Sequence, residues 1–245
     1  MSFTAPSLGR IFPRSSPEKR EFRLRRTVLR TALPLLFFGA APPLLAAPLC
    51  PGPISPASLL LPSPGSPGDT PDRLLELARI LRDHPGGRST GLQALSRAGT
   101  LLSALPGAAR KSSDVRVLRA ERDTQLVLYR GFPGGMRYGK RAERNVDLAL
   151  IQDPSLARAH LLKGIALYYK PWFVGGSVTK ALAEFETADR LSPNDPRILS
   201  WIGVARHRLG RPGARRAMAR VRVLCPQSPF YRLRATSFDP RIPHP

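Results

Sequence analysis

The residue types that most often serve in acid–base catalysis and metal binding are scattered along this 245-residue chain. Its four histidines are far apart and lack the spacing of metal ligands: His84, His160, His207 and His244. The only cysteines are Cys50 and Cys225, which excludes an all-cysteine zinc site and a multi-disulfide framework and leaves open whether the two pair. We therefore expect no metal ion and no cofactor.

Three carboxylates, on Glu184, Glu186 and Asp189, lie close enough in sequence to suggest paired acid–base groups. Their spacing also fits the solvated face of a helix whose opposite face carries Ala181 and Phe185, and we prefer that interpretation. The chain has neither a Gly-x-Ser-x-Gly nucleophile motif nor a phosphate-binding P-loop. The sequence thus predicts a protein that is not an enzyme.

Two further stretches could bind a ligand or partner. The glycine-rich residues 131–139 could hold an anion through backbone N–H groups and Arg137, but they also fit a helix-to-helix turn, which we prefer. Four aromatic residues cluster near a second predicted turn: Tyr168, Tyr169, Trp172 and Phe173. Core packing accounts for part of this cluster, whereas Trp172 and Phe173 fall in the turn and are candidate partner-binding residues.

Four segments that share one helical pattern would have to position these residues. In each segment an alanine is followed by an apolar residue at the fourth position, another at the seventh, and a proline at the twelfth. Offsets of four and seven place side chains on one face of a helix, and the proline ends that helix. The alanine–proline pairs are Ala94–Pro106, Ala142–Pro154, Ala181–Pro193 and Ala214–Pro226.

Glycines precede each of these helices and separate it from another apolar run with helical spacing. The glycine sites are Gly86-Gly87, Gly134-Gly135, Gly175-Gly176 and the looser Gly210-Arg211-Pro212-Gly213. Paired glycines allow positive φ, which favours a tight turn between two helices. Residues 72–227 are therefore predicted to be all-α, with about eight helices paired around these turns.

The pattern from Ala181 to Pro193, Ala-x3-Phe followed by Pro, resembles the second helix of a tetratricopeptide repeat (TPR). Ile202-Gly203 resembles the Leu-Gly pair of its first helix, and Gly164 holds that place one repeat earlier. Successive repeat alanines are 48, 39 and 33 residues apart rather than a steady ~34. The paired glycines are similar to those of exported bacterial TPR proteins, including periplasmic subunits associated with some TRAP transporters. The resemblance implies an α-solenoid of about four TPR-like helical pairs behind a disordered N-terminal segment.

The N-terminal residues predict export from the cytoplasm. An apolar stretch from Ala32 to about Ala47 has the length of a secretory signal and falls short of the ~20 residues that span a bilayer. Arg25 and Arg26, upstream of it, resemble the twin-arginine motif. We expect an export signal or signal anchor over 1–47, a Pro-rich linker over 48–71 and a basic C-terminal tail over 228–245. The expected location is periplasmic or envelope-associated.

The charge of the chain is strongly basic, with a formal net charge of +22. It is unevenly distributed, since residues 142–196 carry a net charge of −1 and residues 197–245 a net charge of +10. Such charge could follow the phosphates of a nucleic acid. No aromatic-rich RNA-binding signature interleaves with the arginines, so we expect no nucleic-acid partner.

In repeats of this type, the resemblance implies, the first helices line a concave groove. The predicted groove positions are polar residues interleaved with apolar ones: Arg119, Arg122, Gln125, His160, Lys163 and Arg206. Most are basic, so the expected partner is a protein or peptide with an acidic surface. The sequence predicts a non-catalytic scaffold, which would touch a membrane only through an uncleaved N-terminal segment. The alternatives are a ligand-binding accessory subunit of a transporter and a nucleic-acid-binding basic helical protein.

Overall fold

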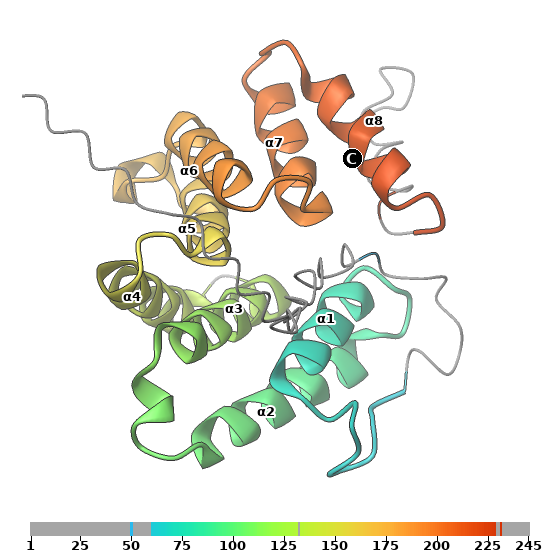
Figure 1. Ribbon diagram of the computed structural model, residues 1–245, viewed down its shortest axis with the longest axis vertical. Helices are drawn as coiled ribbons and strands as arrows, with labels where there is room; N and C mark the ends of the chain where they lie inside the picture. The colour runs from blue at the N-terminus through green and yellow to red at the C-terminus, as the bar shows by residue number, and fades with distance from the viewer. Residues whose placement is uncertain (1–49, 51–59, 132, 229–230, 232–245) are drawn as a thin grey trace, which may run out of the picture. The chain divides into compact units, whose positions relative to one another are not determined.

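A computed structural model describes residues 50, 60–131, 133–228 and 231 of the chain (Figure 1). These residues form eight α-helices and no β-strand, which confirms the all-α prediction. The helices, with two short 3-10 helices η2 and η3, are α1 Pro71–Leu81, α2 Arg88–Ala104, η2 Ala109–Lys111, α3 Ser113–Arg130, α4 Met136–Gln152, α5 Ala157–Tyr169, η3 Trp172–Val174, α6 Val178–Leu191, α7 Pro196–Arg208 and α8 Ala214–Leu224.

Side-chain caps determine where four of these helices begin. An oxygen of each capping side chain accepts a hydrogen bond from a backbone N–H in the first turn, a group that otherwise has no partner within the helix. The capping residues of α1, α3, α6 and α7 are Thr70, Ser112, Ser177 and Asp195. Helices α1 and α7 also carry proline at a first-turn position, where its missing N–H is not needed.

Each helix packs mainly against its neighbours in sequence, most closely within the pairs α1–α2, α3–α4, α5–α6 and α7–α8. In addition α1 contacts α3, α3 contacts α5 and α5 contacts α7, so the first helices of successive pairs adjoin one another. The repeat alanines all lie in the core: Ala94, Ala142, Ala181 and Ala214 are buried. The pairs around the glycine turns are therefore real packing units.

A glycine in the first helix of the last two pairs allows close contact with the second helix. A Cβ atom added to Gly164 of α5 would lie 2.4 Å from Cε1 of Phe185 of α6. A Cβ atom added to Gly203 of α7 would lie 2.7 Å from Sδ of Met218 of α8. Because Phe185 and Met218 both stand four residues after their repeat alanine, the same contact recurs in both pairs.

The turn between α5 and α6 needs its two glycines for different reasons. Gly175 has a φ of 92°, which favours glycine, whereas a Cβ atom on Gly176 would lie only 1.7 Å from the carbonyl oxygen of Lys170. The turn between α3 and α4 differs, because Gly135 has a φ of −82° and the positive φ, 64°, lies at Gly131. The expectation that the paired glycines supply positive φ is thus wrong for the pair Gly134-Gly135.

Part of the predicted linker packs against the helices. Arg97 of α2 donates to the carbonyl oxygen of Pro62 at 2.6 Å and pairs with Asp69 at 2.6 Å. Leu61 packs against the apolar core formed by α1, α2 and α3. Residues 60–70 are therefore part of the helical domain rather than a separate extended segment.

The predicted export segment, residues 1–47, lies outside the described residues, as do most of the predicted linker before residue 60 and most of the basic tail. Two tail residues, Ser228 and Tyr231, are described and buried. Among the described helices, none combines the length and apolar character that crossing a membrane requires.

A disulfide joins Cys50 to Cys225, 175 residues apart in sequence, with a Cα–Cα distance of 5.3 Å. Cys225 packs with Leu199, Val221 and Tyr231 in a small apolar cluster beside α7 and α8. The bond fixes residue 50 to the C-terminal end of α8.

Candidate functional site: the inner surface of α1, α3, α5 and α7

A cavity of about 60 Å³ lies where the first helices of all four pairs come together. Each of the four helices contributes side chains to its wall, and Tyr231 completes it. The charged and amide side chains in the wall are Arg79, Arg82, Glu121, Gln125 and Arg197. We call this wall, with the adjoining ion pairs described next, the inner surface.

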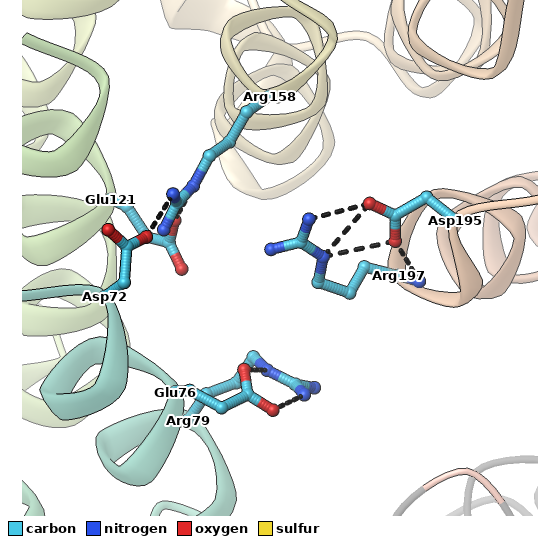
Figure 2. Close-up of polar contacts among 7 residues, drawn as sticks. All are labelled: Asp72, Glu76, Arg79, Glu121, Arg158, Asp195 and Arg197. Carbon is cyan, nitrogen blue, oxygen red and sulfur yellow. Dashed lines mark hydrogen bonds and ion pairs between the residues drawn. The ribbon is translucent and has the colours of Figure 1, made fainter. Parts of the chain in front are cut away.

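Three sets of arginine–carboxylate contacts surround this region (Figure 2). Arg158 of α5 binds both Glu121 of α3, at 2.5 Å, and Asp72 of α1, at 2.6 Å, and so links three helices. Within α1, Arg79 and Glu76 form two hydrogen bonds, of 2.5 and 2.9 Å. The guanidinium of Arg197 at the start of α7 binds Asp195 at 2.7 Å. Charges from distant parts of the chain are thereby gathered in one place.

The electrostatics of the inner surface favour the ionised forms of Glu121 and Arg79. Burial raises the pKa of Glu121, but Arg158 and Arg197 outweigh it, so the net effect is a pKa below the ordinary value. Burial lowers the pKa of Arg79, but the attraction to Glu76 and Tyr231 is the larger effect. The net result is a pKa above the ordinary value of arginine. The Glu121 carboxylate and the Arg79 guanidinium therefore remain charged over the neutral pH range.

Two buried polar groups in the cavity wall have no hydrogen-bond partner within the described part of the chain. The side-chain N–H of Gln125 donates to the carbonyl oxygen of Leu75 at 2.9 Å, whereas its Oε1 atom is unpartnered. The hydroxyl of Ser200 is also unpartnered, and the residue is only 1% exposed. Because buried polar groups are normally hydrogen-bonded, these two can bind water or a polar group of a ligand.

The predicted groove arginines of α3 face the neighbouring helix α2 instead of the inner surface. Arg119 donates to the carbonyl oxygens of Leu102, at 3.0 Å, and Arg110, at 3.2 Å. Arg122 donates to the carbonyl oxygen of Leu95 at 2.8 Å. These side chains satisfy backbone groups between two helix pairs.

The predicted groove residues of α5 and α7 face α6. His160 and Lys163 both bind Glu184, each at 2.7 Å, and Arg206 binds Glu186 at 2.9 Å.

Gln125 alone among the six predicted groove residues lines the cavity between the first helices. It is buried, so the prediction that it is an exposed groove position is wrong. The other five predicted groove residues bind groups of the neighbouring second helix, α2 or α6, instead of facing a groove.

The other two predicted residues, Trp172 and Phe173, lie in η3 of the α5–α6 turn and are exposed, as expected from their place in the turn. They are not part of the inner surface.

Sequence reasoning missed the inner-surface charges. The Glu76–Arg79 pair has a spacing of three that a helical pattern can reveal. The partners of Arg158 lie 37 and 86 residues away, and no sequence spacing indicates them.

A scan against protein-family models finds no match to this chain, and neither does a search of curated proteins. The described residues contain no group of three or more His, Cys, Asp or Glu side chains that could hold a metal ion. The function must therefore be argued from the inner surface itself.

Proposed function

We propose that this protein is a non-catalytic TPR-like scaffold of the cell envelope that binds an acidic segment of a partner protein on its inner surface. The observation that carries the proposal is the cavity to which all four first helices contribute. Its wall holds the cations Arg79, Arg82 and Arg197 against one carboxylate, Glu121.

Each of these arginines already has a carboxylate partner within the chain: Arg79 binds Glu76, Arg82 binds Asp83 and Arg197 binds Asp195. An acidic segment would share their remaining N–H donors, since arginine can bind more than one carboxylate oxygen. The Ser200 hydroxyl can donate to a carboxylate, and Gln125 Oε1 can accept from a backbone N–H of the segment.

Helix packing supports an α-solenoid of four TPR-like pairs. The helices pack in sequence order and the first helices adjoin, as stacked repeats require. The contacts of Gly164 with Phe185 and of Gly203 with Met218 occur at the positions on which the resemblance to TPRs rests.

The disulfide supports an exported location, because disulfides persist in oxidising compartments. We propose a periplasmic or envelope-associated protein that is exported by residues 1–47. A reporter fused after residue 70 should leave the cytoplasm, and replacing Arg25 and Arg26 together by Lys should block its export. Continued export of the double variant would assign the chain to the general secretory route.

The scaffold fits the described geometry better than the two alternative functions do. Cavities of about 60 and 180 Å³ border the first helices, whereas sites that enclose a whole small molecule typically have about 300 Å³ or more. A peptide lying along the surface needs room in such a cavity for only part of a side chain. A transporter accessory that binds a small ligand is therefore less well supported. A nucleic-acid role rests on net charge alone.

A peptide-binding titration tests the acidic preference. Two fluorescent peptides of equal length, one of alternating Glu and Gly and one of alternating Lys and Gly, are titrated with the full chain and followed by anisotropy. The Glu peptide should bind and the Lys peptide should not. Arg82→Glu should weaken binding of the Glu peptide at least tenfold, because one attractive charge becomes repulsive.

Arg215→Glu is the matched control, since Arg215 is an exposed arginine of α8 that is not in the cavity wall. Circular dichroism checks that both variants remain helical. Equal binding of the two peptides, or unchanged affinity in folded Arg82→Glu, would refute the acidic-partner proposal.

A further inference from the structure

The α5–α6 turn displays three consecutive apolar side chains to solvent, which form the aromatic apex, Trp172–Val174. Trp172 is 84% exposed and Phe173 is 71% exposed. Their rings meet edge to face, with centroids 5.9 Å apart. Exposing so much aromatic surface is unfavourable in water, so the apex is a candidate interaction surface.

The backbone of this turn is hydrogen-bonded within itself. The N–H groups of residues 174–177 donate to the carbonyl oxygens of Pro171, Trp172 and Leu167, at 2.9–3.1 Å. A peptide segment enters an apolar phase at low cost only when its polar backbone groups already have partners. The turn meets that condition for these four donors.

The base of the apex is held by packed aromatic rings. Tyr168 and Tyr169, at the end of α5, both contact Trp201 edge to face, at 5.4 and 5.8 Å. Trp201 in turn stacks on the buried Phe185. The apex therefore projects from a preformed support, which reduces the conformational entropy lost on binding.

Cations flank the apex, and the sequence from Tyr168 to Ala183 has no acidic residue. Lys180 is exposed on the first turn of α6, and Lys170 precedes the apex and pairs with Glu143 at 2.5 Å. The guanidinium of Arg208 lies over the ring of Tyr168 at 4.9 Å. Aromatic side chains at an apex with cations behind them suit the boundary between the headgroups and acyl chains of an anionic bilayer.

We propose that the aromatic apex inserts into the surface of an anionic lipid bilayer, with Lys180 at the level of the headgroups. More than half of each of the three side chains is exposed, so a protein partner would have to provide a matching pocket for them, whereas a bilayer accepts them without one. The charge of the flanking segment is complementary to anionic lipid. This role is independent of the inner surface, which involves other residues.

The fluorescence of Trp172 tests the proposal directly. The chain has two tryptophans, and the second, Trp201, is buried. The Trp172→Phe variant emits from Trp201 alone, so subtracting its spectrum leaves the emission of Trp172. The full chain is titrated with vesicles of phosphatidylglycerol and phosphatidylcholine, and with vesicles of phosphatidylcholine alone. Emission from Trp172 should shift to shorter wavelength and be quenched by brominated lipid only in the anionic vesicles. Because this signal reports the environment of Trp172 itself, membrane binding through residues 1–47 does not imitate it.

Two variants test whether a cation beside the apex contributes to lipid binding and whether binding is specific to the apex. Lys180→Glu should raise the lipid concentration at half-maximal shift by about fivefold or more, since one cation near an anionic surface contributes about that factor. Val223→Ser, which removes an exposed apolar side chain of α8, should leave that concentration unchanged.

An emission spectrum unaffected by anionic vesicles would overturn the proposal, as would an equal response to phosphatidylcholine alone. A shift that detergent-solubilised envelope proteins produce and vesicles do not would also overturn it, and would assign the apex to a protein partner.

Discussion

At the scale of single residues, Glu121 has the central position on the inner surface. It lies in α3, binds Arg158 of α5, and is influenced by Arg79 of α1 and Arg197 of α7, so one carboxylate interacts with cations from three other helices. The Glu121 side chain is only 12% exposed, which strengthens these interactions, since solvent screens them less than at an open surface. The charge of Glu121 should therefore affect the stability of the whole helical array.

The lowered pKa of Glu121 predicts a loss of stability in acid. As pH falls, the unfolded chain takes up this proton first, so the contribution is complete above about pH 4.3 and is lost as pH falls through the lower folded-state pKa. Glu121→Gln should lower the free energy of unfolding at pH 7 by about 1–3 kcal/mol. Its urea midpoint should also change less than that of the wild type between pH 7 and pH 3.

Urea titrations monitored by circular dichroism at both pH values measure this difference. Asp147→Asn, at an exposed carboxylate of α4, is the control and should behave like the wild type. Identical pH dependence in wild type and Glu121→Gln would contradict the assignment of Glu121 as a paired group.

Individual contacts of this kind were the least predictable part of the structure. Arg122 and Lys163 were assigned to a groove because polar residues between apolar ones usually face solvent, yet their partners are Leu95 of α2 and Glu184 of α6. The pattern of polar and apolar residues along one helix does not say which other helix its polar side chains will contact. That depends on how the separate helices pack together. Asp123, buried and bound to Arg141 of α4, went unrecognised for the same reason.

At the scale of elements, close helix packing around glycine predicts that three Gly→Ala substitutions change the stability by different amounts. Gly164→Ala should destabilise by about 1–3 kcal/mol, because the new methyl group meets the rigid, fully buried ring of Phe185. Gly203→Ala should cost less, because the contacted Met218 side chain is flexible. Gly139→Ala, whose new Cβ atom has only an ordinary contact at 3.8 Å, should stabilise by about 0.5–1 kcal/mol through helix propensity.

Thermal unfolding of the three variants, followed at 222 nm, gives this order directly. A Gly164→Ala variant as stable as Gly139→Ala would show that α5 and α6 are not in close contact at that position.

The elements themselves were largely predictable. Helix ends follow from prolines, glycines and caps close by in sequence, and the buried faces from the repeated offsets of four and seven, as at Ala181 and Phe185. Both signals are local. The start of the packed domain was placed too late, because the contact of Asp69 with Arg97 spans 28 residues and has no local signal.

At the scale of the whole molecule, the disulfide predicts a stability that depends on redox conditions. Linking residues 50 and 225 restricts the unfolded chain, and such bonds typically contribute about 2–4 kcal/mol. Adding dithiothreitol should therefore lower the melting temperature, and Cys225→Ser should lower it by a similar amount without reductant. Differential scanning calorimetry measures both changes. If the reductant lowers the melting temperature of Cys225→Ser equally, the effect does not come from this bond.

The disulfide also restricts how the chain can mature. With two cysteines in the sequence, there is one intramolecular way to oxidise them, so this chain has no incorrectly paired isomer for a disulfide isomerase to repair. Cys225 is synthesised 175 residues after Cys50, so Cys50 has no intramolecular partner until those residues have been made. During that interval its competing reactions are intermolecular, with a second chain or a small thiol. The yield of correctly oxidised protein should therefore depend on protein concentration and on the thiol–disulfide ratio of the buffer, more than on catalysed rearrangement.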